Sequence, residues 1–378
     1  MNPTPKKLRL ARAAAWLLGG PLGIPGICDI VAEYGSALEG ECMAVYKCGQ
    51  NAPSFLAAFP SGRFAAGFSQ DSNIRIYTGK HSRELSGISF RVHQMIVLRD
   101  GRLASSHDDN IIRVWRIGDA LDECELELAG HTKNVYALAE LPDGRLISGS
   151  SDRTMRIWHI DVFSRNEKSH IDTGKVIILD TENWATCLTV IPSPAENLPV
   201  LVASGSYDTY VRIWDIDVFI DVFSRNERVG NKKSQIDVCV AILDGHTDFV
   251  GVVAALPDRN DASFRLASGS ADRTIRIWKI NVGIENKYVC VCQLILKDHG
   301  ANICALSILP DGRLASSSAD KTIRIWNIDT RDAPEVRGCQ LLLEGHENIV
   351  SALAVLPDGT SSCLLVSGSW DNFIRIWD

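Results

Sequence analysis

The chain has 378 residues, of which 46% are hydrophobic and 22% charged, and this is the composition of an ordinary soluble globular protein. The formal net charge of −7 argues against a nucleic-acid-binding protein, which would usually present a basic face. Eleven cysteines, an odd number scattered mostly through predicted strands, favour a reducing compartment, so we expect the protein in the cytoplasm, with the nucleus as the alternative.

Residues 1–40 form a separate N-terminal segment that precedes the regular part of the chain. Basic residues between Lys6 and Arg12 come before an uncharged run that ends at Cys28. Glycines and prolines between positions 19 and 26 interrupt this run, so it predicts neither a secretory signal nor a membrane span, and we expect no membrane contact. Ile27–Tyr34 then has the apolar spacing of a short helix.

Residues 24–34, IPGICDIVAEY, resemble the opening helix of an F-box, the module that docks a receptor onto a ubiquitin ligase. This resemblance implies a substrate receptor of a ubiquitin ligase with a degenerate F-box-like helix in its N-terminal segment. The alternative is a helix that packs on the remainder of the chain or caps one of its faces.

One sequence pattern recurs seven times from residue 41 to the last residue. The clearest copy is 141–158, LPDGRLISGSSDRTMRIW, which ends in the four-residue motif apolar, arginine, apolar, aromatic. An aspartate stands six positions before the terminal aromatic residue of every copy. These aspartates are Asp71, Asp109, Asp152, Asp208, Asp272, Asp320 and Asp371. Such regularity indicates a repeat architecture, so we expect 41–378 to be one domain despite its length.

Each copy predicts four short antiparallel strands. Ser-Gly-Ser-x-Asp-x-Thr between two apolar runs is typical of a hairpin, because these residues supply turn conformations, so Leu146–Ser150 and Met155–Trp158 are expected to be adjacent strands. Val135–Leu141 precedes them across the turn at 142–144, and Glu123–Leu128 is expected to be the fourth strand. A four-stranded sheet that is apolar on both faces must stack on its neighbours.

These features resemble the WD-repeat β-propeller family, whose blades have Gly-His near the start and Trp-Asp at the end. The resemblance covers about residues 41–378 and implies an all-β fold, a seven-bladed β-propeller of four-stranded antiparallel blades. It also implies that the spare strand Glu41–Lys47 closes the ring by pairing with the C-terminal blade, with Cys42–Tyr46 beside Phe373–Trp377.

A histidine, a serine, an aspartate and a tryptophan recur together in four of the repeats. Serine, histidine and aspartate invite comparison with a hydrolase triad, but their repetition around a ring favours the buried hydrogen-bond networks that the family resemblance implies. The four sets are His131, Ser148, Asp152 and Trp158; His246, Ser268, Asp272 and Trp278; His299, Ser316, Asp320 and Trp326; and His346, Ser367, Asp371 and Trp377. A hydrolase is the competing hypothesis, and it requires an exposed serine.

The first, second and fourth repeats lack this histidine. They carry Gly49, Ile88 and Thr181 at the corresponding positions. We therefore expect their blades to be less tightly cross-linked than the other four.

An arginine stands two residues before the terminal aromatic residue in all seven repeats. Its repetition predicts a scaffold role, in which the stem covers the neighbouring blade and the guanidinium reaches polar groups. The seven are Arg75, Arg113, Arg156, Arg212, Arg276, Arg324 and Arg375.

The family resemblance implies that a partner docks on the upper face, around the central channel. The residues before the turn aspartates are Gln70, Asp108, Ser151, Tyr207, Ala271, Ala319 and Trp370, and those at the start of the innermost strands are Ala52, Arg91, Asn134, Trp184, Phe249, Asn302 and Ile349. As partner-binding residues we single out Tyr136, Trp184, Tyr207, Phe249, Trp370 and Arg91, because large aromatic residues rimmed by polar groups are typical of interface hot spots. The alternative for Trp184 is that it fills the gap left by the missing histidine.

The sequence thus predicts a non-catalytic scaffold that binds a protein or peptide through the upper face of a monomeric propeller within a larger complex. We expect no enzymatic activity and no nucleic-acid partner. Cys290 and Cys292 are the one close cysteine pair, and a metal site would need further ligands nearby. We therefore expect these cysteines to be small buried strand residues, and we expect no metal and no cofactor.

Overall fold

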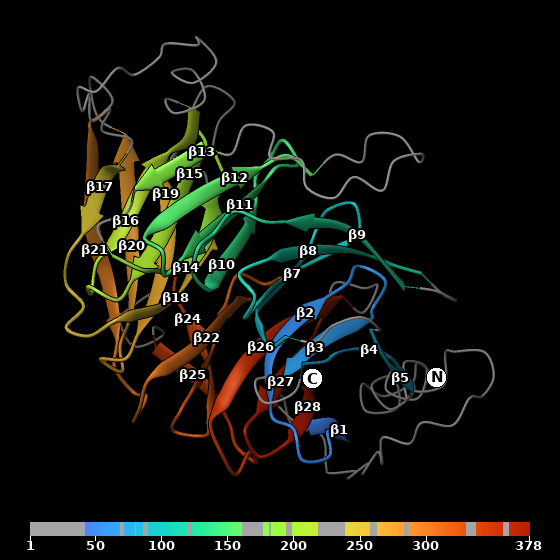
Figure 1. Ribbon diagram of the computed structural model, residues 1–378. Helices are drawn as coiled ribbons and strands as arrows, with labels where there is room; N and C mark the ends of the chain where they lie inside the picture. Colours follow the sequence, from blue (N-terminus) through green and yellow to red (C-terminus); the bar gives the residue numbers. More distant parts are fainter. Residues whose placement is uncertain are drawn as a thin grey trace, which may run out of the picture.

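The computed structural model describes residues 42–68, 72–79, 81–85, 90–118, 122–160, 177–180, 183–193, 199–217, 239–257, 263–282, 287–329, 338–357 and 363–378. Within these ranges the strands β1 to β28 form seven four-stranded sheets. The sheets are arranged as the blades of a propeller around a central axis (Figure 1). The N-terminal segment 1–40, with the helix predicted at 27–34, lies outside the described residues.

The blades are numbered in chain order, and each has an innermost and an outermost strand. Blade one holds β2 (Pro53–Ala58), β3 (Phe64–Phe68), β4 (Ile74–Thr78) and β5 (His81–Glu84), and blade two holds β6 (Val92–Val97), β7 (Leu103–His107), β8 (Ile112–Ile117) and β9 (Asp122–Leu128). Blade three holds β10 (Val135–Glu140), β11 (Leu146–Ser150), β12 (Thr154–Trp158) and β13 (Ile177–Asp180), and blade four holds β14 (Ala185–Ile191), β15 (Leu201–Ser206), β16 (Val211–Asp215) and β17 (Cys239–Leu243). Blade five holds β18 (Val250–Leu256), β19 (Phe264–Ser270), β20 (Ile275–Val282) and β21 (Tyr288–Leu296), and blade six holds β22 (Ile303–Ile308), β23 (Leu314–Ser318), β24 (Ile323–Asn327) and β25 (Gly338–Leu343). Blade seven holds β26 (Val350–Pro357), β27 (Cys363–Ser369) and β28 (Phe373–Trp377), with β1 (Cys42–Lys47) as its fourth strand.

The sequence repeat and the structural blade are offset by one strand. β9 pairs with β8 and completes blade two, whereas β13 completes blade three. Glu123–Leu128 is a strand, as expected, but it lies in the sheet of blade two and not in that of the copy ending at Trp158. The reason is that β9 follows β8 after only a few residues and pairs antiparallel along its free edge, as a short connection favours.

The two ends of the propeller sequence meet in blade seven. β1 pairs antiparallel with β28, with Cys42 opposite Trp377 and Lys47 opposite Phe373. Figure 1 shows β1 beside β28, at opposite ends of the colour scale. The predicted closure of the ring is confirmed, and it covers an edge of β28 that would otherwise be open.

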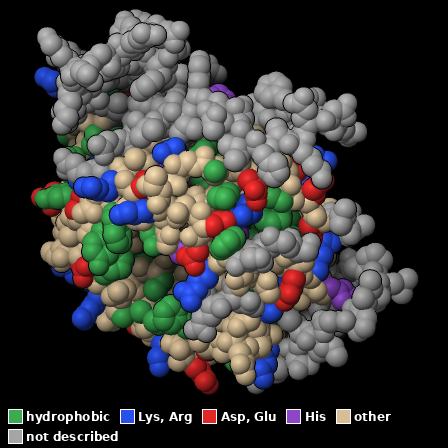
Figure 2. All heavy atoms as spheres, in the orientation of Figure 1, with side chains coloured by type: hydrophobic (Ala, Val, Ile, Leu, Met, Phe, Trp, Pro, Cys, Tyr) green, Lys and Arg blue, Asp and Glu red, His purple; other side chains and the backbone are tan. Residues whose placement is uncertain are grey.

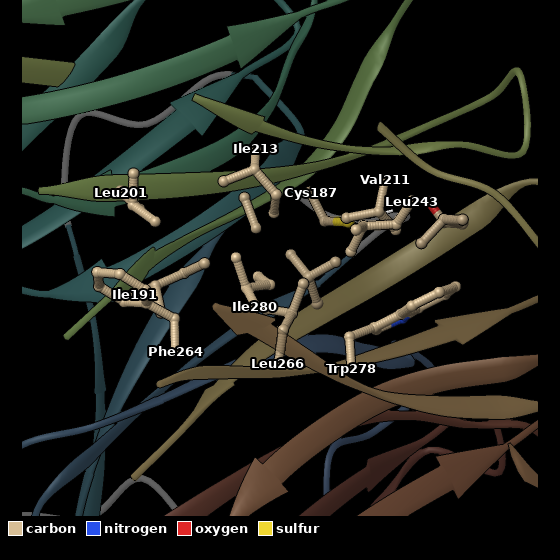
Figure 3. Packing of buried hydrophobic residues seen from close by; sticks show 13 residues of the cluster. Cys187, Ile191, Leu201, Val211, Ile213, Leu243, Phe264, Leu266, Trp278 and Ile280 are labelled. Atoms are coloured by element: carbon tan, nitrogen blue, oxygen red, sulfur yellow. Dashed lines mark hydrogen bonds between the residues drawn. The ribbon is translucent and has the colours of Figure 1, made fainter. Parts of the chain in front are cut away.

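Apolar side chains fill the space between neighbouring blades. All residues of the second strands β7, β11 and β19 are buried, because strands flank them on both edges and blades cover both faces. Between blades four and five, Val211 and Ile213 face Leu266 and Trp278 (Figure 3). Burying one such side chain contributes roughly 1.5–3 kcal/mol, so each blade depends on its neighbours for stability.

Candidate partner-binding surface

Hydrogen bonds join a histidine, a serine, an aspartate and a tryptophan in blade three. His131 Nδ1 lies 2.8 Å from Asp152 Oδ2, and His131 Nε2 lies 2.7 Å from Ser148 Oγ. The Trp158 indole donates to the same serine oxygen at 2.8 Å. With Nδ1 donating to the carboxylate, a neutral imidazole accepts the serine hydroxyl at Nε2, so all four polar groups are satisfied. The serine four residues before the aspartate therefore belongs to the network.

The same network is built around His246, His299 and His346, with histidine-to-serine distances of 2.7, 2.7 and 2.8 Å. Burial lowers the pKa of His246 and His346, as it does that of His131, which favours the neutral ring. The four serine side chains are fully buried, and each hydroxyl is hydrogen-bonded to both the histidine and the tryptophan of its network. None of these four serines is the exposed nucleophile that the hydrolase hypothesis requires.

Blades two and four use an arginine where blades three, five, six and seven use histidine. Arg113 Nη2 lies 2.7 Å from Asp109 Oδ2, and Arg212 Nη2 lies 2.8 Å from Asp208 Oδ2. The expectation of weaker cross-linking overlooked this cation, which reaches the turn aspartate from the same blade. In blade one, Arg75 pairs with Glu84 at 2.9 Å, and Asp71 lies outside the described residues.

Blade two also contains a buried histidine that sequence reasoning missed. His107 Nε2 lies 2.8 Å from Ser105 Oγ, which accepts the Trp115 indole proton at 2.8 Å. The side chain has no exposed surface, and burial lowers the pKa of His107 to about 4. The sequence does carry a signal for this residue. Two residues before the turn aspartate, repeats three to seven have serine, whereas repeat two has His107.

The two sets of residues predicted for the upper face lie next to one another. The amide of Asp108 donates to the Arg91 carbonyl at 3.0 Å, and the amide of Trp370 donates to the Ile349 carbonyl at 2.9 Å. Equivalent bonds join Ser151 to Asn134, Ala271 to Phe249, and Ala319 to Asn302. In blades two, three, five, six and seven, this backbone hydrogen bond therefore places the residue before the turn aspartate next to the residue at the start of the innermost strand. Gln70 lies outside the described residues.

Three aromatic rings from blades four and five, those of Trp184, Tyr207 and Phe249, form a continuous row, which we call the aromatic run. The ring centroids of Trp184 and Tyr207 are 5.6 Å apart, and those of Tyr207 and Phe249 are 5.5 Å apart with nearly parallel planes. Trp184 is 41% exposed and Tyr207 is 58% exposed. In blade four, Arg212 contacts the turn aspartate that histidine contacts in blades three, five, six and seven.

Tyr136 and Arg91 belong to blades three and two and are not part of the aromatic run. The Tyr136 ring meets the ring of His93 with centroids 5.0 Å apart, and His93 Nε2 contacts Asp108 Oδ1 at 2.5 Å. Arg91 is exposed. Tyr136 thus faces blade two, although the sequence interpretation grouped it with the aromatic run.

Trp370 supplies a separate exposed aromatic ring in blade seven, where 47% of its surface is accessible. On the face seen in Figure 2, hydrophobic side chains gather in separate clusters between basic and acidic ones.

Cys290 and Cys292 pack against the core between blades four and five, and burial raises the pKa of Cys290 to about 11. Within the described ranges, no group of three or more potential ligand residues is placed to hold a metal ion, and no helix has the length and hydropathy of a membrane span.

A sequence model described as WD domain, G-beta repeat matches residues 122–159, 176–215, 237–279, 290–327 and 337–378, which make up more than half of the chain. The chain belongs to the WD40-repeat family. The first blade of this WD40 propeller lies outside the matched ranges, and it is also the blade in which Tyr77 replaces the terminal tryptophan.

Curated relatives of this WD40 chain align with parts of it. Probable cytosolic iron-sulfur protein assembly protein 1 of Pyricularia oryzae is 37% identical over 83 residues, which are 22% of this chain and 15% of that protein. Ribosome biogenesis protein WDR12 homolog of Dictyostelium discoideum is 26% identical over 34% of this chain and 22% of that protein. WD repeat-containing protein pop1 of Schizosaccharomyces pombe is 28% identical over 31% of this chain and 14% of that protein. The alignments thus span less than a quarter of each relative.

Among solved structures, the WD40 beta propeller domain of Doa1 matches with a TM-score of 0.65 and 18% sequence identity. The match covers 90% of this chain and 96% of that domain. At this identity, the likeness shows a shared fold and nothing further about function.

Proposed function

We propose that this WD40 propeller is a non-catalytic scaffold that binds a protein or peptide on its upper face. The observation that carries the proposal is the aromatic run, in which the Tyr207 ring lies between those of Trp184 and Phe249, and Trp184 and Tyr207 are exposed. Aromatic side chains offer a large contact area and have few rotatable bonds, so they lose little entropy on binding.

The buried networks below the upper face support this function indirectly. In the fourth blade, the turn that carries Tyr207 is held by the ion pair between Arg212 and Asp208. The neighbouring turn of blade five is held by Asp272, which contacts His246 at 2.8 Å. A surface fixed in this way is preorganised, which reduces the ordering cost of binding.

The proposal is tested by affinity purification from a native extract with the full chain as bait. The double variant Trp184→Ala/Tyr207→Ala is expected to lose the main partners. A matched control is Val289→Ala/Val291→Ala, which also shortens two exposed apolar side chains but on outer strand β21. Circular dichroism and urea unfolding establish that both variants are folded. Retention of every partner by the folded Trp184→Ala/Tyr207→Ala variant would refute the upper-face assignment.

A ubiquitin-ligase receptor is the second candidate function, and it depends on residues 24–34, which lie outside the described residues. A chain that starts at Gly40 tests it in the same purification. The receptor hypothesis expects loss of ligase adaptor subunits with retention of the upper-face partners. If adaptor subunits are absent from the full-length purification as well, this second candidate is excluded.

A further inference from the structure

Asp248 ends the loop that leads into the innermost strand of blade five, directly before Phe249. Its Oδ1 atom accepts the amide proton of Phe249, with an N to O distance of 2.7 Å. Asparagine makes the same contact in two other blades, because Asn183 and Asn348 accept the amide of the following residue at 2.8 and 2.9 Å. A neutral side chain therefore suffices to hold this turn, and the negative charge of Asp248 is not needed for the fold.

The Asp248 carboxylate is exposed, and among the described residues it has no cation partner. Two carboxylates adjoin the aromatic run in sequence, Asp208 after Tyr207 and Asp248 before Phe249. Arg212 pairs with Asp208 at 2.8 Å, so that charge is compensated within blade four. The charge of Asp248 is left for a group outside the described part of the chain.

This carboxylate lies at one end of the aromatic run. It is held at the backbone of Phe249, whose ring stacks on that of Tyr207 with centroids 5.5 Å apart, and the Tyr207 ring meets that of Trp184. Exposed aromatic faces and an exposed carboxylate both attract cations. A guanidinium group suits this combination best, because it is planar, stacks on aromatic rings and donates two parallel hydrogen bonds to a carboxylate, whereas the ammonium group of lysine acts as a point charge.

We propose that the partner segment that binds the upper face presents an arginine at the Phe249 end of the aromatic run. Its guanidinium group pairs with Asp248 and packs against the aromatic rings. This assignment rests on the proposed function and adds a specificity to it, since the rings supply contact area and Asp248 selects a basic residue. The net charge of −7 also favours the approach of a basic segment.

The first test uses the full chain labelled with fluorotryptophan, in which the Trp184 signal of the fluorine NMR spectrum is assigned from Trp184→Phe. The probe is the peptide acetyl-Gly-Ala-Arg-Ala-Gly amide, and the comparison peptides have lysine or citrulline in place of arginine. The arginine peptide is expected to shift the Trp184 signal saturably. The lysine and citrulline peptides are expected to bind at least about threefold more weakly, because neither forms the stacked and forked ion pair.

Asp248→Asn is the decisive variant, because it removes the charge and keeps an acceptor for the Phe249 amide. It is expected to have the urea midpoint of the wild type and to bind the arginine peptide at least about threefold more weakly. The matched control is Glu347→Gln, an equal charge change at an exposed site in blade seven, and it is expected to bind as the wild type does.

Three results would overturn the proposal. They are equal binding of the arginine and lysine peptides, binding by folded Asp248→Asn that equals that of the wild type, and a Trp184 signal that the arginine peptide does not shift.

Affinity purification with the same variants distinguishes failure of this inference from failure of the proposed function. The inference expects Asp248→Asn to lose the partners that Trp184→Ala/Tyr207→Ala loses, and Glu347→Gln to keep them. If the aromatic variant loses the partners and folded Asp248→Asn keeps them, the upper-face function stands and the arginine assignment is wrong. If the folded aromatic variant keeps every partner, the proposed function itself is wrong.

Discussion

Arg212 forms a bidentate ion pair with Asp208, with Nη2 to Oδ2 and Nη1 to Oδ1 distances of 2.8 and 3.1 Å. The pair replaces the contact that histidine makes with the turn aspartate in blades three, five, six and seven. Both side chains are largely buried, with exposures of 7% and 19%. The turn below Tyr207 is therefore fixed by a charge pair instead of a neutral imidazole.

Arg212→Met is expected to lower the free energy of unfolding by about 3 kcal/mol. Methionine keeps much of the hydrocarbon stem but leaves the Asp208 carboxylate without its cation in a largely buried place. The control is Arg313→Met, which breaks the pair with Asp311 whose side chains are 32% and 48% exposed, and it is expected to cost under about 1 kcal/mol. Urea unfolding of both variants measures the difference, and equal losses would count against a structural role for Arg212.

Stability is expected to fall on acidification below about pH 6.5, the ordinary pKa of histidine. Burial lowers the pKa of His131, His246 and His346, and that of His107 to about 4. Between the folded and the ordinary pKa the unfolded chain binds more protons than the folded chain, so the free energy of unfolding decreases as the pH falls. For His107 alone the loss reaches about 3 kcal/mol once the pH is below 4.

The midpoints of urea unfolding, measured between about pH 8 and pH 5, give the slope of stability against pH. His107→Ser introduces the residue that stands here in blades three to seven, and it is expected to make the slope shallower while the protein stays folded. An unchanged slope in this variant would mean that His107 does not titrate in the way its burial implies.

The aspartates of the networks add a second acid-sensitive step. Burial raises the pKa of Asp152, but hydrogen bonds from His131 and Thr154 lower it by more, and the carboxylate stays charged well below its ordinary range. A lowered folded pKa stabilises the protein above the ordinary value of 3.8, and this contribution is lost as the pH falls below it. Acid unfolding of Asp152→Asn is therefore expected to show less loss below about pH 4 than the wild type.

Ser148→Ala is expected to destabilise the protein by about 2 kcal/mol, because it leaves His131 Nε2 and the Trp158 indole proton without their partner. Ser61→Ala removes an exposed serine and is expected to change stability by less than about 0.5 kcal/mol. A serine-directed fluorophosphonate probe is expected to label neither the wild type nor Ser148→Ala. Labelling of the wild type that disappears in Ser148→Ala would favour the hydrolase hypothesis instead.

The ring closure was predictable from the family resemblance, which implies that an N-terminal strand is lent to the last blade. It placed Cys42–Tyr46 beside Phe373–Trp377, and in the structure β1 pairs with β28, with Cys42 opposite Trp377. The arginine substitution in blades two and four was not predictable in this way. Arginine stands at this position in all seven repeats, so the sequence pattern does not distinguish Arg212, which binds aspartate, from Arg276, which does not.

The candidate site was predictable only in part. Alignment to the repeat placed Trp184, Tyr207 and Phe249 near one another, and their rings do touch. Tyr136 lies two residues beyond the corresponding position of blade three, Asn134, and its ring turns toward His93 of blade two. Ring direction depends on the side chains of the neighbouring blade, and a single repeat does not encode them.

Tyr46 joins the closing strand to blade one, and its substitution tests the ring directly. Its side chain is fully buried, its hydroxyl donates to the Gly79 carbonyl at 3.0 Å, and its ring lies edge-on to Phe64 and Tyr77. Tyr46→Ala is expected to cost about 3–5 kcal/mol, since it leaves a cavity at the junction of blades seven and one. Tyr46→Phe keeps the ring and loses only the hydrogen bond, at a cost of about 1 kcal/mol.

The same substitution is expected to change the association state. With β1 loosened, the edge of β28 becomes available to other chains, so Tyr46→Ala should form oligomers that light scattering detects, whereas Tyr46→Phe should stay monomeric. Urea unfolding and light scattering on the same samples separate the two effects. If Tyr46→Ala is as stable and as monomeric as Tyr46→Phe, β1 contributes little to holding the ring, and the stability of the propeller must come from the contacts between the other blades.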